Sequence, residues 1–216
     1  MQTVAKAAVS AIPWVGGPAA ELFALIFRPA LDRRRDEWVS AIAAVVEELR
    51  EKVDGITPES LAQDDSFITI AIQASQVAMR NHQSEKLEAL RNAVQNSALP
   101  GAPEDDLKLM FLNLVDTLTP WHLRILKMLA NPPAWFSERG KPWPAIMAGG
   151  LSNVLEEAFP ELQGRSDFYN LLGRELYTRG LSGTDGFGGL MTGEGLKARR
   201  TTEFGSQFLG FIEKQV

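Results

Sequence analysis

Apolar residues recur at helical spacing along much of the chain, most regularly over residues 36–53. One side of that segment is apolar, whereas Glu47, Glu51 and Lys52 lie on the other side. Apolar positions three or four residues apart share one face of an α-helix. The segment therefore predicts an amphipathic helix, and its apolar face comprises Trp38, Ile42, Val45, Val46, Leu49 and Val53.

Similar patterns predict further helices in the first half of the chain. A short helix is expected after Thr57, which is a capping residue followed by a proline suited to the first helical turn. Two longer helices are expected after Asp65 and from Ser84. The stretch 99–103, Leu-Pro-Gly-Ala-Pro, then interrupts the helical pattern. We place a domain boundary there, between an acidic helical bundle (residues 1–99) and a second domain (residues 101–216).

The second half is also predicted to be mainly helical. Residues 107–118 have an almost wholly apolar face, and Thr119 followed by Pro120 begins another helix. Residues 132–144 read as a loop, while Ser152 and Ser166 are expected to cap two more helices, the second over residues 167–178. Six glycines between residues 181 and 201 suggest a β-hairpin, and a last helix is expected over residues 203–213.

This order of helices, hairpin and closing helix resembles a winged helix-turn-helix domain. The resemblance covers about half of the chain. It rests on residues 119–126 (TPWHLRIL) as a first helix, on residues 167–179 at the place of the recognition helix, and on residues 202–209 (TEFGSQFL), which are similar to a Thr-x-x-Gly-x-x-Phe-Leu segment that follows the wing. The chain is thus expected to be mainly α, with a helical bundle followed by a winged-helix-like domain that has a small β-hairpin wing.

The resemblance implies a recognition helix in the DNA major groove and a wing on the phosphate backbone. Asp167, Glu175, Asp185 and Glu194 lie among the implied cations and weaken their field. A protein partner is therefore an alternative to DNA. The implied DNA-binding residues are Arg165, Tyr169, Asn170, Arg174, Arg179, Lys197, Arg199 and Arg200.

Aromatic residues are concentrated within the loop predicted at residues 132–144. Trp135, Phe136 and Trp143 permit two interpretations: they pack back as a minor core, or they form an exposed contact surface for a protein partner.

An apolar stretch over residues 7–27 contains a single charged residue, Glu21. Its length approaches that of a membrane span, but two prolines and two glycines interrupt it. One interpretation is a pair of core helices joined by a Pro-Gly turn, with Pro29 ending or kinking the second. The alternative is a hairpin that contacts a membrane through Trp14, Leu22, Phe23 and Phe27, with the arginines at 33–35 at the lipid surface.

Composition narrows the chemistry. The chain of 216 residues has no cysteine and two histidines, so thiolate nucleophiles and Cys-based metal sites are excluded. The formal net charge is −5, and the acidity lies in residues 1–104, with 10 basic against 14 acidic side chains. The glycines between residues 183 and 195 fit neither a P-loop nor a dinucleotide fingerprint, because no Lys-Ser/Thr pair follows and no strand precedes.

We therefore expect a non-enzymatic, cytoplasmic binding or regulatory protein of bacterial type without cofactor or metal. Its C-terminal domain would contact DNA or a protein partner. A homodimer is a further alternative for the assembly of the chain. The alternative from another class is a membrane-acting effector whose apolar N-terminal helices insert into a bilayer; a hydrolase comes third.

Overall fold

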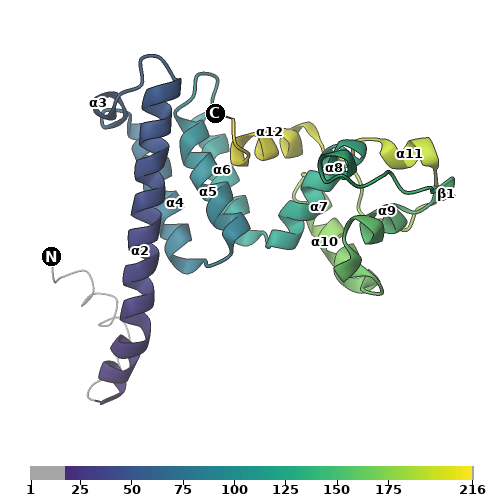
Figure 1. Cartoon of the computed structure of the whole chain (residues 1–216), viewed down its shortest axis with the longest axis horizontal. Coiled ribbons are helices and arrows are strands. Elements are labelled where there is room, and N and C mark those ends of the chain that lie inside the picture. The colour runs from purple at the N-terminus through teal and green to yellow at the C-terminus, as the bar shows by residue number, and fades with distance from the viewer. Residues whose placement is uncertain (1–17, 216) are drawn as a thin grey trace.

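A computed structural model describes residues 18–215 (Figure 1). About 70% of the described residues are helical, in 11 α-helices, and the sheet among them consists of two strands of two residues each. The prediction of a mainly helical chain is therefore confirmed.

The first half forms a bundle of antiparallel helices. Helices α4, α5 and α6 pack on one another, and α2 lies along α4 and α5 (Figure 1). Two side-chain contacts fix the direction of α2 against α4: the Trp38 indole donates to Ser75, and Arg34 donates to the Met79 carbonyl. The elements are α2 (Pro18–Lys52), α3 (Pro58–Leu61), α4 (Asp65–Arg80), α5 (Ser84–Ser97) and α6 (Asp105–Thr117).

Helix α2 is continuous for 35 residues and passes through Pro29. The prediction that Pro29 would end or kink this helix is wrong with respect to the end. A proline removes one backbone hydrogen bond and crowds the carbonyl four residues earlier. Pro29 is exposed, so the carbonyl that loses its partner lies on a stretch of α2 open to water.

The second half continues with shorter elements. They are α7 (Pro120–Ala130), α8 (Pro132–Glu138), β1 (Ala148–Gly149), α9 (Leu151–Ala158), the 3₁₀ turn η1 (Pro160–Leu162), α10 (Ser166–Thr178), β2 (Met191–Thr192), α11 (Gly193–Lys197) and α12 (Glu203–Ile212). Helices α9 and α10 begin about where they were expected, although Gly150 and Arg165 occupy the N-cap positions in place of Ser152 and Ser166.

Residues 132–138 form helix α8, which corrects the prediction of a loop over 132–144. The Asn131 side chain accepts a hydrogen bond from the Ala134 amide, and Pro132 occupies the first helical position. Asparagine followed by proline thus starts a helix here, besides ending α7.

The glycine-rich segment between residues 181 and 201 is not the β-hairpin that was expected. An isolated bridge between Ser182 and Thr201 closes its base, but β2 pairs antiparallel with β1, which precedes α9. Helix α11 follows β2 at once. Gly193 donates to the Met147 carbonyl at 2.8 Å, and a Cβ atom at Gly193 would lie 2.8 Å from the Ile146 carbonyl oxygen. This close approach requires glycine at the strand end.

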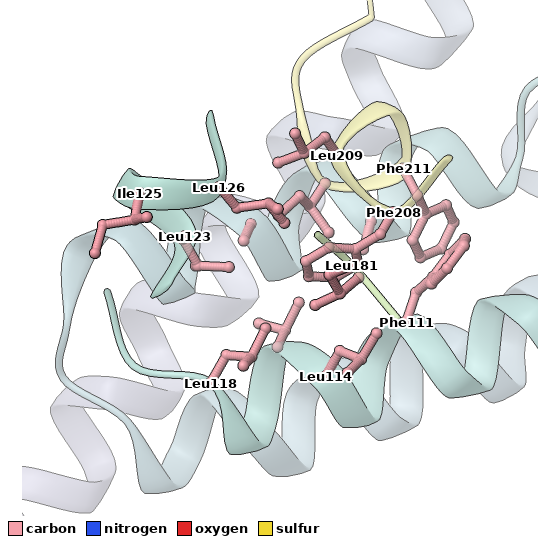
Figure 2. Packing of buried hydrophobic residues seen from close by; sticks show 14 of the residues in the cluster. Phe111, Leu114, Leu118, Leu123, Ile125, Leu126, Leu181, Phe208, Leu209 and Phe211 are labelled. Atoms are coloured by element: carbon pink, nitrogen blue, oxygen red, sulfur yellow. The ribbon is translucent and has the colours of Figure 1, made fainter. Parts of the chain in front are cut away.

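Helix α12 connects the end of the chain to the first bundle. Phe208 and Phe211 lie beside Phe111 of α6 (Figure 2). The ring centroids of Phe204, Phe208 and Phe211 are 5.3, 5.7 and 5.6 Å from that of Phe111. Helix α12 also packs along α5. The turn at residues 99–103 lies where the domain boundary was placed, and a single cluster of buried apolar side chains extends across it.

Two buried asparagines of α5 complete this contact. Asn92 Nδ2 donates to the Ile212 carbonyl at 3.0 Å, and Asn96 Nδ2 donates to the carbonyls of Phe211 and Glu213 at 2.8 and 2.7 Å. The last carbonyls of a helix have no partner within it. The α5 side chains therefore satisfy the C-terminal end of α12.

Candidate functional surfaces

The first turns of α2 project beyond the rest of the bundle (Figure 1). This segment, residues 22–31, is called the apolar extension below. Leu22, Leu25 and Ile26 are 58, 72 and 59% exposed, and Phe23, Phe27 and Leu31 are also exposed. The side-chain hydrogen bonds from α2 to α4 come from Arg34 and Trp38, which follow this segment. The prediction that residues 7–27 are buried in the fold is wrong for residues 21–27, because no described element covers them. Trp14 lies outside the described residues.

Apolar side chains occupy most of the circumference of the apolar extension. At 100° per residue, Leu22, Ile26 and Phe23 lie on one side, and Phe27 and Leu31 widen that side to about half of the helix. Leu25 projects from the opposite side. The rings of Phe23 and Phe27 stack on each other, with centroids 4.2 Å apart. The extension is therefore broader than the single apolar stripe of a helix that packs on one neighbour.

Charged residues gather where the extension meets the bundle. Arg35 lies 3.6 Å from Asp32 and 3.1 Å from Asp36, and Arg33 lies 3.8 Å from Glu37. These pairs are well exposed and stabilise the helix little. Residues 32–37 thus form a polar collar around α2, and Arg28 lies one turn earlier, within the apolar extension. Within the described residues, none of the helices combines the length and apolar character needed to cross a bilayer.

The residues implied in DNA binding do not form one continuous, unoccupied surface, because two of them bind other parts of the chain. Tyr169 is buried and donates to Glu156 at 3.0 Å. Arg200 is half-buried and donates to the Gly195 carbonyl at 2.6 Å, so it holds the turn before α12. Both assignments are corrected: these side chains bind within the domain.

The other basic side chains implied in DNA binding differ in whether they contact residues of the chain. Lys197 pairs with Glu194 at 2.7 Å, Arg165 stacks over Phe168, and Arg179 donates to Thr117. The side chains of Arg174 and Arg199 are exposed and make no hydrogen bond or ion pair with any other described residue. Asn170 is half-buried. On α10, Leu171 and Tyr177 are each 50% exposed, so this helix presents a mixed rather than a basic face.

The aromatic group of the second half is part of the core. Trp135 and Phe136 are buried, and Trp143 packs against them with its ring 5.4 Å from that of Phe136. Trp135 also contacts Phe159 and lies under the Arg139 guanidinium. Of the two interpretations, the exposed contact surface is corrected, because folding of residues 132–138 into α8 turns these rings inward.

The two histidines occupy contrasting environments. His82 is exposed, whereas His122 is buried between α7 and α10. His122 Nδ1 accepts a hydrogen bond from the Thr119 amide, and Nε2 lies 3.0 Å from the Glu175 carboxylate. Burial lowers the pKa of His122, and the Glu175 charge opposes part of this shift. The spacing Thr-x-x-His is a sequence signal for the capping contact between Thr119 and His122, and nothing local indicates the contact with Glu175. The described residues contain no cluster of His, Asp and Glu that could hold a metal ion.

Two groups of exposed apolar side chains were not named as contact residues from the sequence. One is Leu25, Ile26 and Leu31, which lie beside the membrane contacts expected at Leu22, Phe23 and Phe27. The other is a face of α2 and α4 around Val39 and Ile72. The available signal for the second group was the absence of charged residues between Asp65 and Arg80.

Comparisons of this chain with protein-family models, with curated proteins and with solved structures find no match.

Proposed function

We propose that this protein docks on a membrane surface by inserting the apolar extension of α2 into one leaflet. The observation that carries this proposal is the exposure of six large apolar side chains within residues 22–31, which cover more than half of the circumference of a projecting helix. Arg28 is the one charged residue of this segment. A helix whose apolar surface is broader than one stripe is suited to burial in a core or in lipid.

The length of the extension supports insertion into one leaflet. Ten residues of α-helix span about 15 Å, roughly half of the hydrocarbon thickness of a bilayer. The polar collar from Asp32 to Glu37 would then lie among the lipid head groups. Its cations and acids nearly balance, so attraction to anionic lipid adds little.

Burial of the apolar side chains supplies the driving force. Complete burial of a Leu, Ile or Phe side chain contributes about 1.5–3 kcal/mol, so the upper limit for six is about 18 kcal/mol. The side chains are already partly covered, and ordering and desolvation costs reduce this value further. Binding of an interfacial helix scales with the apolar area that it buries. Docking is a binding function, and no step of catalysis is proposed.

Flotation of the full chain with vesicles tests the proposal. Vesicles of phosphatidylcholine, with or without phosphatidylglycerol, should carry the protein upward. A Phe23→Glu, Phe27→Glu variant should lose most binding, because charge on the apolar side opposes insertion. Met110→Glu is the matched control, since Met110 is a similarly exposed apolar residue on α6. Circular dichroism should show the same helix content in all three proteins.

A fluorescent label gives a second readout. The chain has no cysteine, so Ile26→Cys accepts a single environment-sensitive dye. Its emission should shift to the blue with vesicles, and high salt should change the binding only slightly. Absence of flotation, equal flotation of the double glutamate variant, or binding abolished by salt would each overturn the proposal.

A second candidate function is weak DNA contact by the C-terminal half, which the free cations Arg174 and Arg199 favour. If these two side chains neutralise two phosphates, log affinity should fall with log salt at a slope of roughly −2. Fluorescence anisotropy with duplex DNA measures this slope. Arg174→Glu and Arg199→Glu should each weaken binding, whereas Lys127→Glu on α7 is the control; equal affinities or no binding at low salt would exclude this candidate.

A further inference from the structure

Helices α2 and α4 share an exposed face, and among the described residues Arg35 is the one charged side chain that lines the groove on it. The groove has a volume of about 460 Å³, and its lining also includes Val39, Ile68, Ala71, Ile72 and Ser75. Val39 and Ile72 line this groove, and their side chains are 59 and 54% exposed. We call this surface the α2–α4 face. It lies on the bundle part of α2 and is separate from the apolar extension.

The composition of this face is unusual for a helix that faces solvent. Residues 66–79 of α4 contain no charged side chain, and neither do residues 38–46 of α2. Helix α5, by contrast, carries Glu85, Glu88 and Arg91 on its accessible side. Outer helix faces of soluble bundles are normally charged, and the depletion of charge marks the core of protein interfaces.

We propose that a second copy of this chain covers the α2–α4 face, with the two α4 helices antiparallel. Charge favours this occupant. Asp64 caps α4, which begins with Asp65 and ends with Arg80. Each end of one α4 therefore meets the opposite charge on an antiparallel partner. A surface complementary to itself after a twofold rotation defines an isologous dimer.

The spacing along α4 agrees with this symmetry. Ile72 lies eight residues from both Asp64 and Arg80. The twofold axis therefore passes near Ile72, which faces Ile72 of the second copy. Ala71 and Ser75 are small, and small residues permit close approach of two helices. Arg80 contacts Asp116 at 2.9 Å but stays 65% exposed, so it can also face a partner acid.

Molar mass measurement tests the dimer without any membrane, so its outcome is independent of the proposed docking function. Light scattering of the full chain should give twice the chain mass of 23.8 kDa. Ile72→Glu should return the mass of one chain, because it places two carboxylates at the axis. Met110→Glu should leave the dimer intact. Circular dichroism verifies that each variant is folded.

A disulfide probe tests the antiparallel register. The natural chain has no cysteine, so Ile72→Cys provides one thiol per copy. Mild oxidation should give a covalent dimer, and Met110→Cys should stay uncrosslinked. A wild-type mass of one chain would overturn the proposal. So would a dimer that persists with Ile72→Glu, or one in which Ile72→Cys forms no crosslink.

Discussion

Helix α2 has two parts that both carry apolar residues at helical spacing and that differ in their surroundings. In the bundle part, Val45 and Leu49 are fully buried against α4 and α5. In the apolar extension, Leu22 and Leu25 have the same chemistry but stand open. Helical periodicity determines which residues share a face, whereas a neighbouring element determines whether that face is covered. The same pattern therefore serves stability in one part and is free for binding in the other.

The largest expected difference between the two parts lies in their leucines. Leu49→Ala should lower the free energy of unfolding by about 2–5 kcal/mol, because it leaves a cavity in a packed core. Leu25→Ala should change it by about 0.5 kcal/mol or less, since Leu25 is exposed. Urea unfolding of both variants measures the difference. Equal losses would mean that the apolar extension is covered in solution.

The next effect concerns the hydrogen bonds between Asn96 of α5 and the end of α12. Asn96→Ala should lower the free energy of unfolding by about 1–3 kcal/mol, because the carbonyls at the end of α12 lose buried donors. Asn113→Ala on the exposed side of α6 is the matched control. If both substitutions cost the same in urea, the end of α12 does not stabilise the bundle.

A weaker effect distinguishes the covered histidine from the open one. The pKa of His122 is lowered in the fold, so below about pH 6.5 the unfolded chain binds a proton that the folded chain does not. Stability should therefore fall as the pH decreases from about 7 to about 5. His122→Gln should flatten this dependence, whereas His82→Gln should preserve it. Denaturant titrations at several pH values provide the measurement, and an unchanged slope in His122→Gln would contradict the assignment.

The smallest effect is expected in the collar of the extension. Arg33→Ala removes an exposed pair with Glu37 and should change the free energy of unfolding by less than about 0.5 kcal/mol. Thermal unfolding checks this value. A larger loss would show that the collar contacts another part of the chain.

Much of the helical fold could be predicted because local signals agreed with packing. The apolar spacing from Trp38 to Leu49 and the pair Thr119-Pro120 marked helices that the structure contains. Where one local signal had two meanings, the prediction was wrong. Asn131-Pro132 was read as an end, although it also caps α8, and the glycines after Leu181 suggested a hairpin although β2 finds its partner in β1.

The candidate surfaces were harder to predict than the helices. Phe23 and Phe27 were noted as membrane contacts, but their exposure depends on which element lies beside α2, and no local pattern encodes that. Tyr169 and Arg200 suited a DNA surface by position, yet Glu156 and the Gly195 carbonyl bind them. Long-range partners decide such cases.

The contact between α5 and α12 also has a consequence for how the chain is made. Asn96 binds carbonyls 115 and 117 residues later in the sequence. During translation, α5 and α6 emerge long before residues 203–212. Until α12 is made, Phe111 lacks the phenylalanine rings that contact it in the folded protein. Contacts of such separation form late and leave apolar surface open to chaperones meanwhile. A ribosome-bound chain that stops before α12 should therefore be more sensitive to protease within α5 and α6 than the released protein.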